Sequence, residues 1–246
     1  MQRKIILTLI IFLAISFSQL SAQQEKDMTP EYISSIKSAL HQLNDLLSRP
    51  KNGKTIHHIV YRIRTVMRDP KLPISEDKVE LFSGTKRSCL LSKHMQAYYN
   101  ENNSIVALPD QRLITISRNV SAIHSKIYEG KLLLQDTFLN NYVVEDHDEV
   151  YRNTILHKRI LLKQKEKNKT YPFPSINFEI NSISGDLVSV NIHYRQESEI
   201  DSVEILFEQM ELNTKTDQLE RSAENIFLDK KGKPTGKYKN YRVIHI

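Results

Sequence analysis

Residues 176–194 read INFEINSISGDLVSVNIHY, and the pattern of a β-sheet is clearest in this stretch. Its two apolar-rich runs, 176–183 and 187–194, flank Ser184-Gly185-Asp186. Runs of this length around a short turn predict a β-hairpin, with glycine at the position that needs a positive φ. The second run is apolar at every second position, so these side chains should share one face of the strand: Val188, Val190, Ile192 and Tyr194. One face of the hairpin must therefore be buried by other elements of the chain.

Other segments with the same alternation predict that the hairpin belongs to a large sheet. The longest is 55–67, in which apolar and charged side chains alternate. Its apolar face carries Ile59, Tyr61, Ile63, Thr65 and Met67, and its wet face carries His58, Arg62, Arg64 and Arg68. Shorter strands are expected at 79–82, 88–91, 95–99, 105–108, 113–116, 155–162, 203–212 and 238–246. Together these segments predict an antiparallel meander in two groups of strands.

Three segments have helical patterns. Thr29-Pro30-Glu31 supplies a cap, a proline and an early acid, and residues 30–48 repeat apolar side chains every three or four positions. Residues 121–140 are helical by content, and 218–226 should form a helical turn. The fold class that follows is α+β: a large curved antiparallel sheet, forming an incomplete barrel, covered by two or three helices.

The first 22 residues predict export. Arg3 and Lys4 precede an apolar run at 5–17, and small residues end at Ala22, which is the pattern of a cleaved signal peptide. The run is shorter than the roughly 20 residues that cross a bilayer, which disfavours the alternative of a retained anchor. Cleavage would leave 23–246 as a single half-barrel domain, and the short signal fits the periplasm of a bacterium.

Net charge limits the kinds of binding partner, and cysteine content excludes an internal disulfide. The chain has a formal net charge of +6, of which Arg3 and Lys4 contribute two, so +4 remains after cleavage. This excess is too small for a nucleic-acid signature, but it favours transient contact with anionic membrane headgroups. Cys89 is the only cysteine, so no internal disulfide can form and stability has to come from a hydrophobic core.

No catalytic or cofactor-binding motif stands out, because HExxH, GxSxG, P-loop and GxGxxG patterns are all missing from the sequence. The run Glu145-Asp146-His147-Asp148-Glu149 contains metal-ligand types in no known spacing, and we predict a solvated turn there.

His57 and His58 should point to opposite faces of their strand, so they cannot share a metal ion. Cys89 is expected to be a buried structural thiol. The lysines of 230–239 could contact anionic headgroups or lie in a solvated loop. We favour the loop, because the glycine and proline residues among them indicate a turn.

The order helix, strand group, helix, strand group resembles the periplasmic lipoprotein carriers and the wider outer-membrane lipoprotein-sorting (LolA/LolB-like) superfamily. The resemblance lies in the helix at 30–48 leading into the strand at 56–67, the strands around 95–99 and 105–108, and 178–194 running into 203–212. It implies a half-barrel whose inner face holds a lipid or acyl chain, with helices as a lid, no covalent chemistry and no cofactor. The inner-face candidates for lipid contact are Ile59, Tyr61, Ile63, Tyr98, Val190, Ile192 and Tyr194.

Two other classes of function stay open. A periplasmic scaffold or protein-interaction module would have the same sheet with an interior filled by side chains, and would bind its partner along an edge strand. An envelope hydrolase is disfavoured, because no pair of carboxylates and no nucleophile with its base can be located by spacing.

Overall fold

The computed structural model describes residues 30–47, 55–100, 103–118, 136–165, 172–212 and 223–246, together with 214, 216 and 219. The predicted signal peptide at 1–22 lies outside these residues, as does most of the helix predicted at 121–140. In the helices of the described ranges, no stretch is both long enough and apolar enough to cross a membrane.

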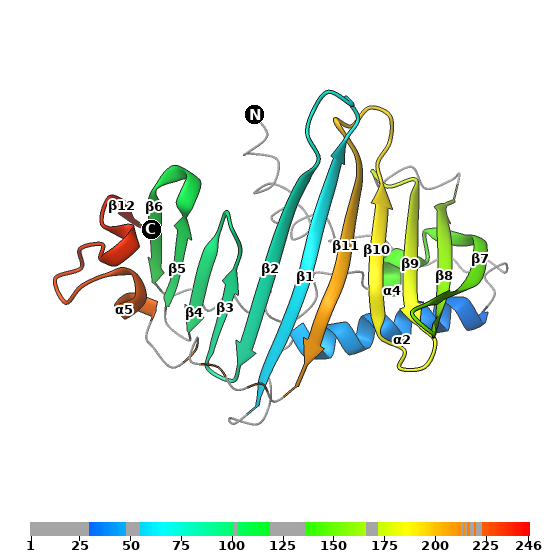
Figure 1. Ribbon diagram of the computed structural model, residues 1–246, viewed down its shortest axis with the longest axis horizontal. Helices are drawn as coiled ribbons and strands as arrows, with labels where there is room; N and C mark the ends of the chain where they lie inside the picture. The colour runs from blue at the N-terminus through cyan, green and yellow to red at the C-terminus, as the bar shows by residue number, and fades with distance from the viewer. Residues whose placement is uncertain are drawn as a thin grey trace.

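A single open sheet of twelve strands forms the body of the described structure (Figure 1). In spatial order the strands are β12 (Arg242–His245), β6 (Leu113–Arg118), β5 (Asn103–Leu108), β4 (Gln96–Asn100), β3 (Arg87–Leu91), β2 (Ser75–Gly84), β1 (Ile56–Met67), β11 (Ile200–Glu211), β10 (Leu187–His193), β9 (Ser175–Asn181), β8 (Ile155–Gln164) and β7 (Tyr142–Arg152). Neighbouring strands are antiparallel, except that β12 runs parallel to β6. The predicted α+β class with a large antiparallel sheet is confirmed.

The hairpin of β9 and β10 is close to the prediction. Gly185 has a φ of +77° in the turn, which a residue with a side chain rarely adopts. The register shifts between Leu187 and Ser189, so Leu187 pairs with Ile180 and enters the core. The shift passes over Val188 in the pairing with β9, so the predicted alternation of buried side chains is observed from Val190 to Ile192.

The long helix α2 (Pro30–Leu47) begins at the predicted proline and packs across β1, β9 and β10. It buries one face, made of Ile33, Ile36, Ala39, Leu40 and Leu43. The other helical elements are short: α4 (Asp136–Leu139), α5 (Ala223–Phe227), and the 3₁₀ turns η1 (Pro109–Gln111) and η3 (Gly236–Tyr238). The strand predicted at 238–246 is thus shorter than expected, because Tyr238 lies in η3 with its ring buried.

The acidic run 145–149 lies within the edge strand β7, and the predicted solvated turn is wrong there. The side chains of the run are exposed, and β7 pairs only with β8. Asp148 forms an ion pair with Arg159 of β8, and Lys163 Nζ lies 2.6 Å from Glu145 Oε1. Charges on an edge strand oppose pairing with a further strand, which accounts for a strand of this composition.

The sheet buries different faces at its two ends. Directly paired residues of antiparallel strands point to the same face. His58 pairs with Phe82, Phe82 with Cys89, Cys89 with Tyr98, and Tyr98 with Ile105, so these five share a face. We call this the α5 face, since α5 packs on β4 and β5. The opposite side is the α2 face.

The two faces overlap at the start of β1. His57, His58, Ile59 and Val60 are all buried, although they alternate between the α2 face and the α5 face. The prediction that His58 lies on a wet face is therefore wrong, since its ring is stacked on Phe82 at 4.2 Å. The wet character begins further along β1, at the arginines that follow.

Candidate functional site

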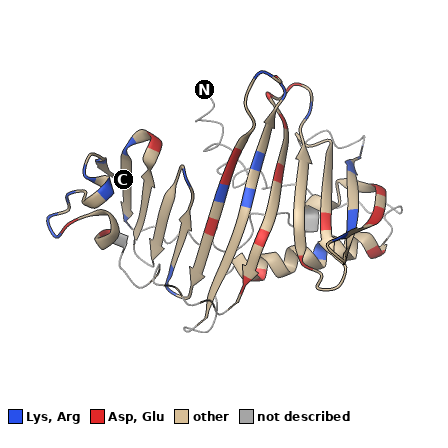
Figure 2. Ribbon diagram, viewed as in Figure 1, with Lys and Arg blue, Asp and Glu red and all other residues tan. Residues whose placement is uncertain are grey.

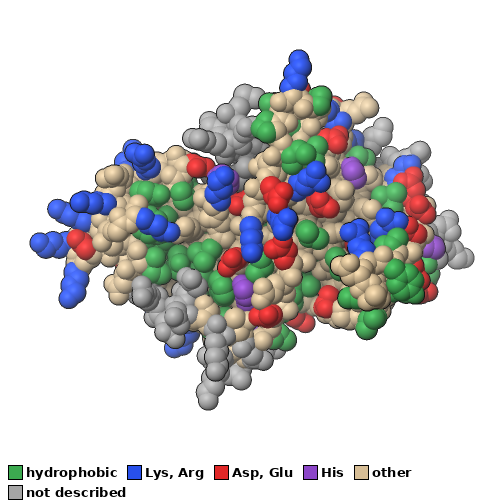
Figure 3. Space-filling view, viewed as in Figure 1, with side chains coloured by type: hydrophobic (Ala, Val, Ile, Leu, Met, Phe, Trp, Pro, Cys, Tyr) green, Lys and Arg blue, Asp and Glu red, His purple; other side chains and the backbone are tan. Residues whose placement is uncertain are grey.

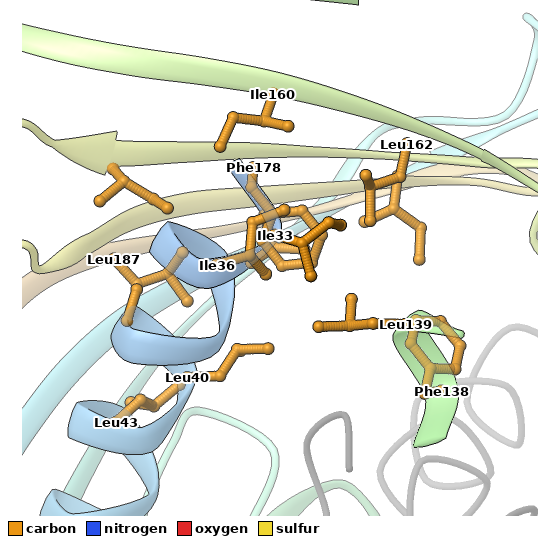
Figure 4. Packing of buried hydrophobic residues seen from close by; sticks show 14 of the residues in the cluster. Ile33, Ile36, Leu40, Leu43, Phe138, Leu139, Ile160, Leu162, Phe178 and Leu187 are labelled. Carbon is orange, nitrogen blue, oxygen red and sulfur yellow. The ribbon is translucent and has the colours of Figure 1, made fainter. Parts of the chain in front are cut away.

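The layer between α2 and the sheet is filled by apolar side chains, which we call the α2 core. Its members are Ile33, Ile36, Ala39, Leu40, Leu43, Ile59, Phe138, Leu139, Tyr142, Ile160, Leu162, Ile176, Phe178, Ile180, Leu187, Val190 and Ile192. Figure 4 shows side chains of α2, α4 and the strands β8, β9 and β10 pointing toward one another. Each such side chain removed from water contributes about 1.5–3 kcal/mol, so this core is a main source of stability.

Polar contacts at both ends of α2 hold the helix on the sheet. Near its start, the Tyr32 ring stacks on His147 of β7 at 4.0 Å, and Glu31 pairs with Lys158 of β8 at 3.3 Å. At its end, His57 Nδ1 lies 2.8 Å from the Leu46 carbonyl oxygen, so this nitrogen carries the proton and donates it. The helix is thus fixed over β1 and β8–β10.

Beyond α2, the same face continues into a second group of buried residues, the distal cluster. It consists of Met67, Ile200, Val203 and Ile205, and contains no residue of α2 or of α4. Four partly buried apolar side chains pack against it: Tyr61, Ile63, Tyr194 and Phe207, which we call the bridging patch. Three of them, all but Ile63, also pack against the α2 core. The bridging patch therefore joins the two clusters along one face.

Register explains why these four side chains meet. Tyr61 pairs with Phe207 and Ile63 with Ile205 across β1 and β11, after a register shift between Val60 and Tyr61. The Tyr61 and Phe207 rings lie 6.0 Å apart. Tyr194 follows β10 directly, and its ring meets that of Phe173 edge-on at 5.1 Å. The patch is thus an aromatic-rich surface built from three chain segments.

The surroundings of the bridging patch are of low polarity, and the charge near its edge is that of Asp77. Burial, with a smaller contribution from the negative charge of Asp77, raises the pKa of Tyr61 to about 12. Burial alone raises the pKa of Tyr194 to about 12. Asp77 is itself buried and pairs with Ile63 across β1 and β2. Both phenols therefore stay neutral at ordinary pH.

The structure brings together six of the seven residues that the sequence singled out for lipid contact. Ile59, Val190 and Ile192 lie in the α2 core with exposed fractions of 1%, 5% and 7%. Tyr61, Ile63 and Tyr194 form most of the bridging patch. Tyr98 lies apart from them on the α5 face, where its ring meets Phe227 edge-on at 5.4 Å.

Phe207 is a patch residue that the sequence reasoning missed. It lies in the strand predicted at 203–212, two positions after Ile205 and four after Val203. This alternation was a usable signal, but pairing of the strand with β1 was needed to bring Phe207 opposite Tyr61. Without the pairing, its ring could not be assigned to the same face as the other candidates.

The α5 face of the central strands is charged. Arg62 pairs with Glu76 of β2 and with Glu208 of β11, and Lys78 lies 3.8 Å from the same Glu208. Arg64 pairs with Glu204. Figure 2 shows these opposite charges side by side on β2, β1 and β11. This face suits water and offers no place for an acyl chain.

Residues on the α5 face at the other end of the sheet form a third cluster, the α5 core. It consists of Phe82, Cys89, Tyr98, Ile105, Ala107, Ile114, Ile116, Phe227, Leu228 and Tyr238. Cys89 is fully buried there, as predicted. Burial raises the pKa of its thiol to about 12, so the nucleophilic thiolate is disfavoured.

Metal-ligand side chains do not gather in the described ranges: no group of three or more His, Cys, Asp or Glu residues there is placed to hold an ion. In β7, the carboxylates of Glu145 and Asp148 are each paired with a cation of β8, Lys163 and Arg159.

Comparison with known proteins gives similarity in structure only. No protein-family model and no curated protein matches the sequence. An uncharacterized conserved protein from Thermus thermophilus is similar over 88% of this chain and 99% of its own, with 8% identity and a TM-score of 0.42. A domain assigned to outer membrane lipoprotein sorting, from Vibrio parahaemolyticus, is similar over 75% and 95%, with 9% identity and a TM-score of 0.30.

A LolA superfamily protein from Nitrosomonas europaea is similar over 75% of this chain and 94% of its own, with 10% identity and a TM-score of 0.28. At these identities the similarity concerns the arrangement of strands and helices alone.

Proposed function

We propose that this protein is a non-enzymatic, exported protein of the bacterial envelope that binds a lipid or the acyl chain of an acylated cargo. The observation that carries the proposal is the bridging patch. Its four apolar side chains are partly buried, and they continue the α2 face past the end of the helix packing. An acyl chain laid across Tyr61, Ile63, Tyr194 and Phe207 would extend the apolar layer that α2 provides elsewhere.

The energetics of such binding need only modest enclosure. Each methylene removed from water contributes about 0.8 kcal/mol, so about ten methylenes would supply roughly 8 kcal/mol before the costs of ordering. The α2 core itself consists of buried side chains of the protein. Cargo would therefore lie beside α2 and reach Ile59, Val190 and Ile192 only if the helix moved.

The place of action follows from the sequence. The signal peptide predicted at 1–22 would deliver residues 23–246 to the periplasm as one half-barrel domain. The net positive charge supports transient contact with anionic membrane surfaces, from which a lipid-binding protein would take up its cargo.

Native mass spectrometry of the gently purified protein tests the proposal. We expect co-purifying lipid, and we expect a fluorescent long-chain fatty acid to bind to the delipidated protein. Ile63→Asp, which places a carboxylate in the patch, should lower both. Leu206→Asp is the matched control, because Leu206 is partly exposed and lies on the opposite face, where it pairs with Arg62.

Ile63→Thr serves if the aspartate variant does not fold, since threonine keeps the β-branch and replaces the ethyl group with an uncharged hydroxyl. Its melting temperature should stay close to that of the wild type while bound lipid falls. Full lipid binding by folded Ile63→Asp, or the lack of lipid and of fatty-acid binding in the wild type, would contradict the proposal.

A second candidate is a periplasmic scaffold or protein-interaction module. The α2 core favours it, because buried side chains of the protein itself occupy the layer under α2, as a rigid scaffold needs. The same mass spectra distinguish the two: a scaffold would carry no lipid and would bind a protein partner along the edge of β12, since the charges on β7 oppose pairing there.

A further inference from the structure

One end of the sheet carries a dense group of positive charges. Its members are exposed and lie between the end of α5 and β12: Lys230, Lys231, Lys233, Lys237, Lys239 and Arg242. We call this group the basic pole. Asp229 is the only acidic residue in the stretch 229–246. Figure 3 shows Lys and Arg side chains projecting from this end of the molecule.

The chain that carries the basic pole is held in place. Asp229 Oδ1 accepts hydrogen bonds from the backbone N–H groups of Lys231 and Lys233, at 2.8 Å and 2.9 Å. Gly232 takes a φ of +75° in the same turn, which is closed by a β-bridge between Leu228 and Pro234. Since Leu228 belongs to the α5 core, the lysines project from a fixed base.

The cations of the basic pole differ from those at the centre of the sheet. On β1 and β2, Arg62, Arg64 and Lys78 each have a carboxylate partner within 4 Å. Among the described residues, no ion pair involves the six cations of the pole, and Lys237 has only the Tyr238 ring, at 5.0 Å. The pole therefore has an uncompensated positive potential.

We propose that the basic pole docks the protein on an anionic phospholipid bilayer. This rests on the proposed envelope function, in that the protein must meet a membrane to exchange lipid. Five of the six cations are lysines, whose point charges suit a diffuse layer of headgroups, whereas arginine suits fixed bidentate contacts.

The test is co-sedimentation of the purified protein with vesicles of phosphatidylcholine, with or without 30% phosphatidylglycerol. The wild type should bind only the anionic vesicles, and 0.5 M NaCl should release it. The triple variant Lys230→Gln, Lys231→Gln, Lys233→Gln should bind about 100-fold more weakly, since each lysine near the surface contributes roughly fivefold.

A matched triple variant, Arg64→Gln, Lys78→Gln, Lys163→Gln, makes the same change in net charge at paired cations and should bind nearly as the wild type. Equal losses in both triple variants, or no loss in the pole variant, would overturn the proposal. So would binding of the wild type to DNA or to an acidic polypeptide in preference to anionic vesicles.

Lipid cargo, followed by native mass spectrometry, separates this inference from the proposed function. The pole variant should keep its co-purified lipid while losing vesicle binding. A wild type that carries lipid but ignores anionic vesicles would refute the docking surface alone. A wild type that binds vesicles but never carries lipid would refute the cargo site alone.

Discussion

The two halves of the sheet bury opposite faces. In the α2 half, made of β7–β11 and β1, a long helix covers one face and the other carries ion pairs or is exposed. In the α5 half, made of β2–β6 and β12, the buried cluster lies on the other face under a short helix. The halves meet where β1 and β2 are buried on both faces, at His57–Val60 and at Phe82. A single sheet can thus support two cores that share no buried residue.

The largest expected effect tests whether the two cores are independent. Phe178 and Phe227 are both fully buried, one in the α2 core and one in the α5 core. Phe178→Ala should lower the free energy of unfolding by about 3–5 kcal/mol, the usual cost of such a cavity. Phe227→Ala should cost less, about 2–3 kcal/mol, because the segment from 223 onward can release locally. Urea denaturation measures both losses.

Hydrogen exchange shows in which half of the sheet each substitution lowers stability. Phe227→Ala should speed exchange in β3–β6 and leave β8–β10 protected, and Phe178→Ala should do the reverse. The double variant should show additive losses within about 0.5 kcal/mol, as expected for sites that share no partner. Strong coupling between the two substitutions would mean that the halves form one cooperative core.

A smaller effect is expected from the charged face of the α2 half. Glu179 is buried there, accepts a hydrogen bond from His157 Nδ1 at 2.7 Å, and pairs with Arg152 at 2.8 Å. Glu179→Ala leaves His157 without this partner and should cost about 1–3 kcal/mol. Glu204→Ala breaks an exposed pair and should cost less than about 1 kcal/mol. Thermal unfolding measures both losses of stability. If they are equal, burial does not determine how much these ion pairs contribute to the free energy of unfolding.

Alkaline pH should weaken both halves by the same mechanism. The pKa values of Tyr61 and Tyr194 in the α2 half and of Tyr238 in the α5 half are each raised to about 12, chiefly by burial. A raised pKa means that their stabilising effect is complete below pH 10 and is lost as pH rises from 10 through 12. Absorbance at 295 nm should show these phenols ionising together with loss of circular dichroism.

Phenylalanine variants assign the alkaline effect to each half. Tyr194→Phe and Tyr238→Phe should each make stability less dependent on pH between 10 and 12. Tyr238→Phe should also cost about 1 kcal/mol at neutral pH, because its hydroxyl donates a hydrogen bond to Gln96. A pH dependence that neither variant changes would exclude these two phenols as its cause.

The smallest effect concerns labelling and leaves the native stability unchanged. Cys89 is fully exposed to reagents only when the α5 half opens, and the raised pKa of its thiol slows reaction further. At pH 8, the wild type should react with a thiol reagent far more slowly than unfolded protein. Phe227→Ala should speed this reaction and Phe178→Ala should leave it nearly unchanged. Rapid labelling of the folded wild type would show that the α5 half is already open.

The sequence predicted the elements that local patterns specify. The helix beginning at Pro30 and the hairpin around Gly185 were both found, because a proline at a helix start and a glycine in a tight turn act through their own backbone preferences. The acidic run at 145–149 was misassigned as a turn, since its composition resembles a loop and only its pairing with β8 makes it a strand. Local pattern cannot supply a partner strand.

The candidate site divides in the same way. Alternation placed Tyr61 and Ile63 on one apolar face of their strand, and the structure agrees. It could not place Tyr98 relative to them, because alternation gives the face within one strand and not the register between strands. Two of the bridging residues, Tyr194 and Phe207, reach the patch through the pairing of β10, β11 and β1.

By itself, the chain's sequence determined a strand-rich α+β protein with one amphipathic helix, since these depend on the spacing of apolar, charged and turn residues. Only the tertiary structure decided which face each half of the sheet buries. That choice depends on register, on the bulge after Val60 and on where α2 and the segment from 223 onward pack. The reason is physical: a strand has two faces of equal backbone geometry, and the elements that cover it from a distance select the one that leaves water.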